Sequence, residues 1–441
     1  MNEEVKGPRS LKRLLTAGCI AIVTIPLVAL VLFALFRTSE LNLKIAELRS
    51  QGLPTSAVEL NDWYAVPPDV ADTTGLWLAA TTAVTNAEMD PRTTIMPFVG
   101  KGPTPVPAPG HEWAELGICK TFLDDRDTEI QLIMHAADAG GMARYPVDFR
   151  DGLDAILSAQ QQTRGLARFL ALRAHVHAHE GRHSEVLKDI KAIFAVSDSL
   201  RGEPLLISQL IRNGIHAIGC KLVADLVPHC AWNDEELEDL QTSIGKADFR
   251  NGMLRAFQGE RVNCLTAIDS YGIVFRDINK LKAIELYKEF TEGLAISWQE
   301  TTNRNQKIEE ECASIAAGRA SRMIYTYAML LVPSMQQAAN SGMRAEARQN
   351  CAIAAIAAYR YRLHHGTLPQ SLSELQSLIP GDAAEKASRL IDSFDSQPLR
   401  FKSNTHQITI YSIGENKVDD DGDIEDGEQQ PLDVGYSVTD Q

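Results

Sequence analysis

The sequence is short of the patterns by which many enzymes and nucleic-acid-binding proteins are recognised. It contains no G-x-S-x-G nucleophile elbow, no Walker A loop and no dinucleotide-binding glycine pattern, so hydrolases of that type and the common nucleotide-binding folds are not indicated. Basic residues (43) are outnumbered by acidic residues (58) and form no basic stripe. This balance argues against nucleic acid as a partner.

The cysteines lack the C-x-x-C spacing of a structural zinc site. One of the seven, Cys19, lies in an apolar run near the start, and the other six are scattered singly through stretches that we expect to be helical. Buried free thiols are the simplest interpretation. One or two disulfides stay open as an alternative, with Cys220 and Cys230 closest in sequence, and the connectivity cannot be derived from spacing.

What the chain does contain is one long apolar run at residues 14–36, without a charged side chain. At ~1.5 Å per residue a helix of this length crosses ~30 Å of hydrocarbon. A cleaved signal peptide has a shorter apolar region that ends in small residues, whereas this run ends Leu-Phe-Ala-Leu-Phe. We therefore predict an uncleaved single-pass anchor in an inner or plasma membrane. The positive-inside rule places its N-terminus in the cytoplasm, because four basic residues precede the run: Lys6, Arg9, Lys12 and Arg13.

Residues 37–111 are predicted to form a stalk and a proline-rich linker. Leu41, Ile45 and Leu48 recur at helical spacing, which predicts that the helix continues beyond the apolar run and stands off the membrane. Prolines then crowd the stretch between residues 91 and 109. Because proline can neither continue a helix nor donate to a sheet, this stretch is predicted to be a surface loop with polyproline character.

Residues 112 to about 365 carry amphipathic helical patterns separated by short turns. In one of them, the apolar positions of 186–194 fall on a single stripe. Short connections between such helices give antiparallel neighbours, as in bundles and α-solenoids. No strict 34-residue period is present, so the sequence predicts stacked helical hairpins without identifying tetratricopeptide repeats.

The character of the chain changes after Gly366, which is placed to end the last long helix. Ser371 and Glu374 fit a capping box that would open a further short helix. Residues 397–402 and 407–412 are predicted to be two antiparallel strands, because apolar and polar residues alternate in the second and a four-residue loop joins them.

Several segments resemble a family of bacterial single-pass membrane proteins that has no assigned activity. The resemblance covers most of the chain and implies the architecture of an anchored helical ectodomain. The residues that carry it are Gly52-Leu53-Pro54, Trp63-Tyr64, Tyr145-Pro146-Val147-Asp148, Gly165-Leu166-Ala167-Arg168 and the run from Glu203 to Leu210.

Residues 350–436 resemble the C-terminal part of the major pseudopilin of type II secretion systems. The resemblance rests on Gly366-Thr367-Leu368-Pro369, the strand pair, Tyr411-Ser412-Ile413-Gly414, an acidic loop and Leu432-Asp433-Val434-Gly435. In that family the loop after the second strand binds calcium, which holds the small sheet together. The chain departs from the family in two ways. It lacks a prepilin cleavage site, and it has Asp392-Ser393-Phe394-Asp395 where an aspartate-proline-aromatic turn is usual.

The acidic loop is also a candidate metal site on physical grounds. Carboxylates this close repel one another unless a cation neutralises them, and calcium takes six to eight oxygen ligands in flexible geometry. The loop is not an EF-hand, since Gly422 at position 6 would put Lys417 at position 1. A solvated acidic tail is the alternative. The predicted calcium ligands are Asn416, Asp419, Asp421, Asp423, Asp426 and Asp433.

Residues 179–183 match the zincin signature H-E-x-x-H. That chemistry needs both imidazoles one helical turn apart, with the glutamate acting as general base on zinc-bound water. Gly181 costs a helix roughly 1 kcal/mol relative to alanine, and the apolar period changes phase at this point. We therefore predict a turn between two helices, and keep a zinc-dependent hydrolase that uses His179, Glu180 and His183 as an alternative.

Together these observations predict a mainly α protein with a transmembrane helix, a helical-hairpin ectodomain of solenoid or bundle type, and a small C-terminal α+β cap. The predicted segments are a cytoplasmic N-terminus (1–13), the anchor (14–36), the stalk and linker (37–111), the helical ectodomain (112–347) and the cap (348–441). The predicted function is that of an extracytoplasmic scaffold or interaction protein without catalytic activity, whose cap is stabilised by calcium. Its protein partner is unidentified, and an accessory role in a secretion or pilus-like machine is a second possibility.

Overall fold

The computed structural model describes residues 9–154, 157–271, 275–331, 335–404, 406–424 and 432–439. Within these ranges the side chains of residues 9–23, 26, 27, 29, 30, 152–154, 271 and 331 are not described. The described chain is mainly helical and carries a small three-stranded antiparallel sheet near its C-terminus. This much of the predicted fold class is confirmed.

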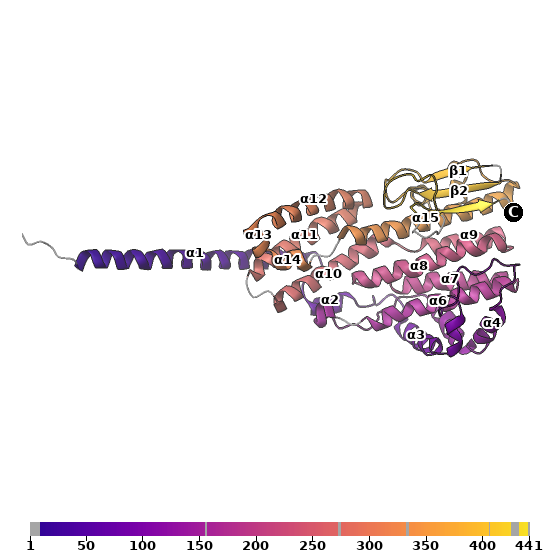
Figure 1. Ribbon diagram of the computed structural model, residues 1–441, viewed down its shortest axis with the longest axis horizontal. Helices are drawn as coiled ribbons and strands as arrows, with labels where there is room; N and C mark the ends of the chain where they lie inside the picture. The colour runs from indigo at the N-terminus through magenta and orange to yellow at the C-terminus, as the bar shows by residue number, and fades with distance from the viewer. Residues whose placement is uncertain are drawn as a thin grey trace, which may run out of the picture.

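The helices and strands follow one another along the chain in the order of Figure 1. The α-helices are α1 (Arg9–Ser50), α2 (Ala57–Trp63), α3 (Thr74–Glu88), α4 (Leu116–Asp124), α5 (Asp127–Ala139), α6 (Ser158–His179), α7 (His183–Ser199), α8 (Leu206–Leu226), α9 (Asp234–Gly245), α10 (Phe249–Tyr271), α11 (Arg276–Ile296), α12 (Trp298–Ala317), α13 (Arg319–Ile324), α14 (Thr326–Leu331), α15 (Met335–His365) and α16 (Ala383–Ser388). The strands are β1 (Arg400–Ser403), β2 (Gln407–Ser412) and β3 (Val434–Thr439).

The body is a stack of antiparallel helices that lie along the long axis of the molecule (Figure 1). α6 packs against α7 and α8, and α15 packs against α8 and α9. α3 and α5 cover the stack on one side, while the sheet covers α15 on the other. One large apolar cluster runs through all of these elements, from Trp77 to Val438. The predicted boundary between ectodomain and cap, at 347/348, falls inside α15.

Two glycines set the geometry of the central hairpins. Gly181 has a φ of 70°, a conformation that only glycine adopts without cost, and it turns the chain from α6 into α7. Gly219 on α8 faces Phe194 on α7, where a Cβ atom would lie 2.7 Å from the ring. Any larger residue at 219 would push the two helices apart, because interiors are close-packed.

The cap is a sheet in the order β1-β2-β3, with both pairs antiparallel. Ile408 pairs with Val438 and Ile410 with Tyr436, and all four side chains are buried in the large cluster beside α15. The Tyr436 hydroxyl donates a hydrogen bond to a backbone oxygen of α8 at 3.0 Å. The cap is therefore packed into the body's core through its inner face.

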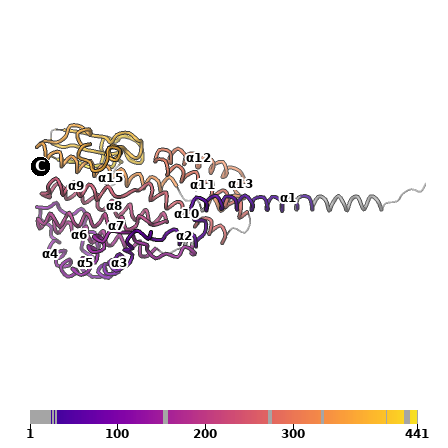
Figure 2. Tube along the Cα trace, turned by 180° about the vertical axis from the view of Figure 1, so that it is seen from behind, coloured from indigo at the N-terminus to yellow at the C-terminus, as the bar shows by residue number. Residues whose placement is uncertain are grey.

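The prediction that the helix continues beyond the apolar run is confirmed, because α1 extends to Ser50, and this continuation is docked on the body. The C-terminal part of α1 lies along α11 (Figure 2), and Leu41 and Leu48 are buried in a second apolar cluster with α10, α11 and α12. Polar contacts reinforce the packing. Thr38 donates to Asp277 at 2.6 Å. The free energy gained by burying apolar side chains holds the helix against the body.

Among the described residues, no helix offers a stretch that is both apolar and long enough to cross a bilayer. Residues 14–23 of the predicted span lie outside the described side chains. The anchor therefore stays a prediction.

Two smaller elements differ from the sequence predictions. The segment after Ser371 forms two 3₁₀ turns, 372–374 and 376–378, instead of a capped α-helix, and Ser371 makes no capping hydrogen bond. β3, which follows the acidic loop, was not predicted as a strand. The prediction of free thiols is confirmed for the described cysteines, of which Cys119, Cys220, Cys264 and Cys351 are buried. No disulfide closes among the described residues.

Asp392 organises the turn that leads into the cap, and we expect its removal to destabilise the protein. Its buried carboxylate accepts hydrogen bonds from the Ser412 hydroxyl at 2.7 Å and from two backbone amides, those of Phe394 and Ile413, at 2.9 Å each. Asp392→Ala would leave these buried donors unsatisfied and lower the free energy of unfolding by about 3 kcal/mol, measured by urea denaturation. Asp395→Ala, which removes a more exposed partner of Arg400, should cost less than about 1 kcal/mol. Equal losses would contradict this assignment.

Candidate functional site

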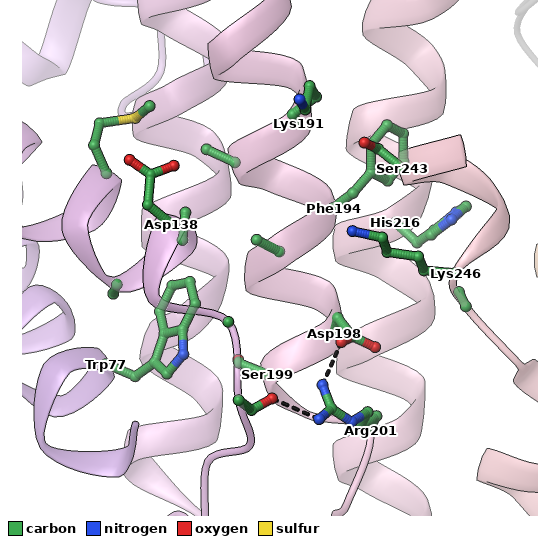
Figure 3. A pocket seen from close by; sticks show the side chains of 18 of the residues that line it. Trp77, Asp138, Lys191, Phe194, Asp198, Ser199, Arg201, His216, Ser243 and Lys246 are labelled. Carbon is green, nitrogen blue, oxygen red and sulfur yellow. Dashed lines mark hydrogen bonds and ion pairs between the residues drawn. The ribbon is translucent and has the colours of Figure 1, made fainter. Parts of the chain in front are cut away.

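A groove of about 480 Å³ runs beside α7 (Figure 3). Its walls come from the end of α5, one face of α7, part of α8 and the end of α9. Trp77 and Phe194 are among its lining residues but are almost completely buried. Cations outnumber acids in the lining, and the charged residues are Lys188, Lys191, Arg201, Lys246, Asp138 and Asp198. In a chain with a net charge of −15, this groove is a place that favours an acidic group.

The charges of the groove are held in place by local contacts. Arg201 donates to the backbone oxygen of Gly141 at 2.5 Å and pairs with Asp198, as the dashed lines in Figure 3 show. Lys191 lies 2.5 Å from a carboxylate oxygen of Asp239, outside the groove lining. Lys246 is exposed at the end of α9. Because the ammonium groups are at or near the surface, they can turn toward a partner at little cost.

His216 lies at the inner side of the groove and is almost completely buried. Burial lowers its pKa to about 3, so the imidazole is neutral at ordinary pH. One ring nitrogen lies 3.3 Å from the Ile244 backbone oxygen and the other 3.4 Å from the Cys220 sulfur. Both nitrogens are engaged inside the protein. The groove is thus better suited to binding than to proton transfer through this histidine.

A buried hydrogen-bond network lies behind the groove and centres on Glu203. The Tyr64 hydroxyl donates to the Glu203 carboxylate, and the Gln160 amide nitrogen lies 3.4 Å from both of its oxygens. The Tyr64 oxygen also accepts the backbone N–H of Tyr145 at 2.8 Å. The Tyr145 hydroxyl in turn lies 2.8 Å from the hydroxyl of Ser199, which lines the groove. Burial raises the pKa of Glu203 to about 7.

This network joins segments that are far apart in the sequence. Three of them, around Tyr64, Tyr145 and Glu203, are segments that carry the resemblance to the single-pass membrane family. Glu203 could not be recognised from the sequence as a functional residue, because it belongs to no motif of catalytic or metal-binding residues. The signal that was available is the resemblance itself, whose segments converge on one buried carboxylate.

The H-E-x-x-H residues do not share a helix. His179 ends α6, Gly181 forms the turn and His183 begins α7. The His179 ring nitrogen lies 3.0 Å from the Pro107 backbone oxygen, while a His183 ring nitrogen accepts the backbone N–H of Ala231 at 3.0 Å. The predicted turn is confirmed, and the one-turn helical spacing that zincin chemistry requires is absent.

Glu180 is also engaged in this turn. Its carboxylate forms ion pairs with Lys120 and Arg182, and these contacts lower its pKa. A glutamate held between two cations is a poor general base, because a lowered pKa weakens its hold on a proton.

The acidic loop is partly described, and Asp433 is its best-defined residue. One carboxylate oxygen of Asp433 accepts the Gly422 N–H at 2.8 Å, and the other has no hydrogen-bond partner among the described residues although it is buried. Burial and the neighbouring carboxylates of Asp420 and Asp419 raise the pKa of Asp433. An unpaired buried oxygen beside other carboxylates fits a hard cation such as calcium.

The remaining predicted ligands surround Asp433 only in part. Asp423 accepts the Asp433 N–H through its backbone oxygen at 3.1 Å, and Asp419 accepts the Tyr411 hydroxyl at 3.0 Å. Asp421 pairs with Lys402, and the Asn416 amide donates to Asp420. Within the described part of the chain, no group of three or more His, Cys, Asp or Glu side chains is arranged to hold a metal ion. Asp426 lies outside the described residues.

Comparisons with known proteins give no independent identification. No protein-family model, no curated protein and no solved structure matches the chain. Both resemblances therefore rest only on the residues that carry them, and the function has to be argued from the chain itself.

Glu203 predicts a pH dependence of stability. Its pKa is about 7 in the folded protein against 4.5 for an ordinary glutamate, so the folded state binds the proton more tightly than the unfolded state. The contribution of Glu203 to the free energy of unfolding is greatest below pH 4.5 and is lost as the pH rises toward 7. The free energy of unfolding should fall by about 3 kcal/mol over this range. Glu203→Gln, which does not titrate, should lose this fall. We expect the difference between the two proteins in urea denaturation to grow over that window.

The matched control for Glu203 is Glu180→Gln, because the contacts of Glu180 lower its pKa instead. The stability that Glu180 contributes is lost as the pH falls, not as it rises. A Glu203→Gln protein whose stability keeps the wild-type slope between pH 4.5 and 7 would contradict the assignment of a raised pKa to Glu203.

The calcium hypothesis predicts that chelation lowers the thermal midpoint of the protein and that calcium restores it, since a ligand bound only to the folded state stabilises that state. Asp433→Asn should abolish the response to calcium while it keeps the shape of the side chain. Glu415→Gln is the matched control, because this exposed residue of the same segment pairs with Asn340 and is not a predicted ligand. A thermal midpoint that changes with neither chelator nor calcium would contradict the proposed calcium site.

Proposed function

We propose that the chain is a membrane-tethered, extracytoplasmic interaction protein, a scaffold without catalytic activity of its own. The observation that carries the proposal is the surface of α1. Seven of its described apolar side chains are exposed by 45 to 68%, on a helix that projects from one end of the body (Figure 1): Ile25, Val28, Val31, Leu32, Phe33, Leu35 and Phe36. An exposed apolar surface of this kind marks a membrane or protein contact. The uncharged run and the basic residues before it favour the membrane.

The junction between α1 and the body supports a rigid tether. Arg37 ends the apolar run and pairs with Glu40 at 2.7 Å, and burial in the second apolar cluster begins at Leu41. Within a few residues of one continuous helix, exposed apolar side chains give way to side chains that pack against the body. Such an arrangement holds the body at a set orientation to the membrane, because no flexible linker separates the two.

The groove beside α7 is the partner-binding surface in this proposal. It carries more cations than acids, which suits an acidic segment of a protein partner. The cap, stabilised by calcium bound around Asp433, would cover the opposite side of α15 and keep that long helix in place. Neither role requires a chemical step.

A second candidate is an accessory role in a secretion or pilus-like machine. It is favoured by the form of the cap, in which a long helix packs against a small antiparallel sheet with an acidic loop between β2 and β3, as the pseudopilin resemblance implies. Purification from membranes in mild detergent would separate the two, because a machine component should bring other subunits with it in fixed ratio.

The anchor predicts a sharp effect of charge at the centre of the apolar run. Ile25→Arg would place a guanidinium at mid-bilayer, at a cost of about 2.5–3.5 kcal/mol for insertion, and should move the protein out of the carbonate-resistant membrane fraction. Leu43→Arg is the control, since Leu43 is 70% exposed on the same helix but beyond the run. This control should remain in the membrane. A wild-type protein found in the soluble fraction would refute the tether.

A further inference from the structure

We propose that residues 319–330, the α13–α14 tip, form a second membrane contact that lies in the headgroup layer of an anionic phospholipid bilayer. The occupant of this surface is the lipid of the same leaflet that α1 leaves. The inference rests on the proposed membrane tether. It adds that the body touches the bilayer and is not merely suspended from it.

The position of the tip follows from a short series of hydrogen bonds. Thr38, two residues beyond the apolar surface of α1, donates to Asp277 in the first turn of α11 at 2.6 Å. Two residues further along α11, the Asn279 amide donates to the Ile324 backbone oxygen at 2.7 Å and accepts the Ala328 N–H at 3.0 Å. The tip is thereby fixed to the turn of α11 at which α1 emerges (Figure 1).

These contacts place the tip at the depth of the lipid headgroups. From Phe36 to Thr38 on α1, and from Asp277 to Asn279 on α11, the helix rises ~3 Å each, so Asn279 and the tip bonded to it lie roughly 6 Å beyond the end of the apolar run along the helix axis. The polar layer on each side of the hydrocarbon is about 5 to 8 Å thick. α13 and α14 therefore lie at or within that layer when residues 14–36 span the bilayer.

The chemistry of the tip matches this depth. Met323 on α13 is 67% exposed and Leu330 on α14 is 75% exposed, so each of the two short helices presents an apolar side chain to the outside. Tyr325 and Tyr327 are half-buried between them, and tyrosine is enriched at membrane interfaces because its ring is apolar and its hydroxyl polar. Exposed apolar side chains next to such rings are what an interfacial segment inserts.

The charge of the tip is positive, in a protein that is acidic overall. Residues 319–330 contain two arginines, Arg319 and Arg322, and no acid. Both arginines are exposed, and among the described residues neither forms an ion pair. Asp269 and Asp277, where α10 ends and α11 begins, are paired with Lys280 and Arg276. An unpaired basic residue near an anionic membrane surface is worth about 1 kcal/mol.

The same two features explain why lipid is favoured over a protein partner. The exposed apolar side chains belong to two short helices rather than to a large complementary face, and the tip lies next to the place where α1 leaves the body (Figure 1). A protein that bound here would have to fit between the body and the bilayer. Lipid is already present at that position.

The test uses the full chain in nanodiscs of defined composition, with an environment-sensitive fluorescent amino acid at Met323 or Leu330 and brominated phospholipid as quencher. We expect quenching at both positions to be several-fold stronger than at Met89, the control position. Met89 is 80% exposed, but it lies at the end of α3, far from the tip in both views (Figures 1 and 2). Replacing the anionic lipid with phosphatidylcholine, or introducing Arg319→Glu with Arg322→Glu, should reduce quenching at position 323.

The outcomes separate this inference from the proposed tether. A protein that does not co-elute with nanodiscs at all would refute the tether, and with it the premise of the inference. A protein that co-elutes but is quenched no more at 323 and 330 than at 89 would overturn the inference alone. Equal quenching in anionic and neutral nanodiscs would contradict the role of the arginines. Loss of quenching at 323 when a co-purified protein is present would show that a protein covers the tip instead.

Discussion

The docking of α1 on α11 is the constraint on which the proposed arrangement depends. The same helix carries exposed apolar side chains up to Phe36, and its Leu41 and Leu48 are buried in the body's second cluster. Because a helix is continuous and stiff over this distance, whatever fixes one half orients the other. The hydrogen bond from Thr38 to Asp277 lies between the two parts. In the proposed arrangement, the orientation of the body and the depth of the α13–α14 tip follow from this joint.

α15 plays the corresponding role inside the body. It contacts the helices α8, α9 and α10 as well as two of the three strands, so the cap and the helical stack share one core. Much of the buried surface of α15 is alanine, which lets neighbouring elements approach closely while the helix keeps a high intrinsic propensity. The polar link from Tyr436 to α8 reaches across this helix. A calcium site in the cap would consequently stabilise more than the sheet.

The charged groups of the groove and of the Glu203 network differ in their exposure to solvent. The groove presents its cations at or near the surface, where their energy depends on what approaches. Glu203 is completely buried, and its energy depends on the protein alone. The link from Ser199 through Tyr145 and Tyr64 joins the two. The link runs through Tyr145 as a residue, because its hydroxyl contacts Ser199 while its backbone N–H donates to Tyr64.

Local pattern was enough to predict the helical hairpins, the turn at Gly181 and the first two strands, because period, glycine and alternation act over a few residues. The docking of Leu41, the network around Glu203 and the strand that follows the acidic loop depend on contacts between segments far apart, which no local pattern encodes. The H-E-x-x-H match illustrates the difference. The residue types match a zinc-binding motif, but Gly181 has a left-handed backbone conformation, and the turn it forms places the two histidines on separate helices. Sequence alone determined the elements and their composition, and tertiary packing decided which side chains meet, since close packing selects among arrangements that local preferences leave equal.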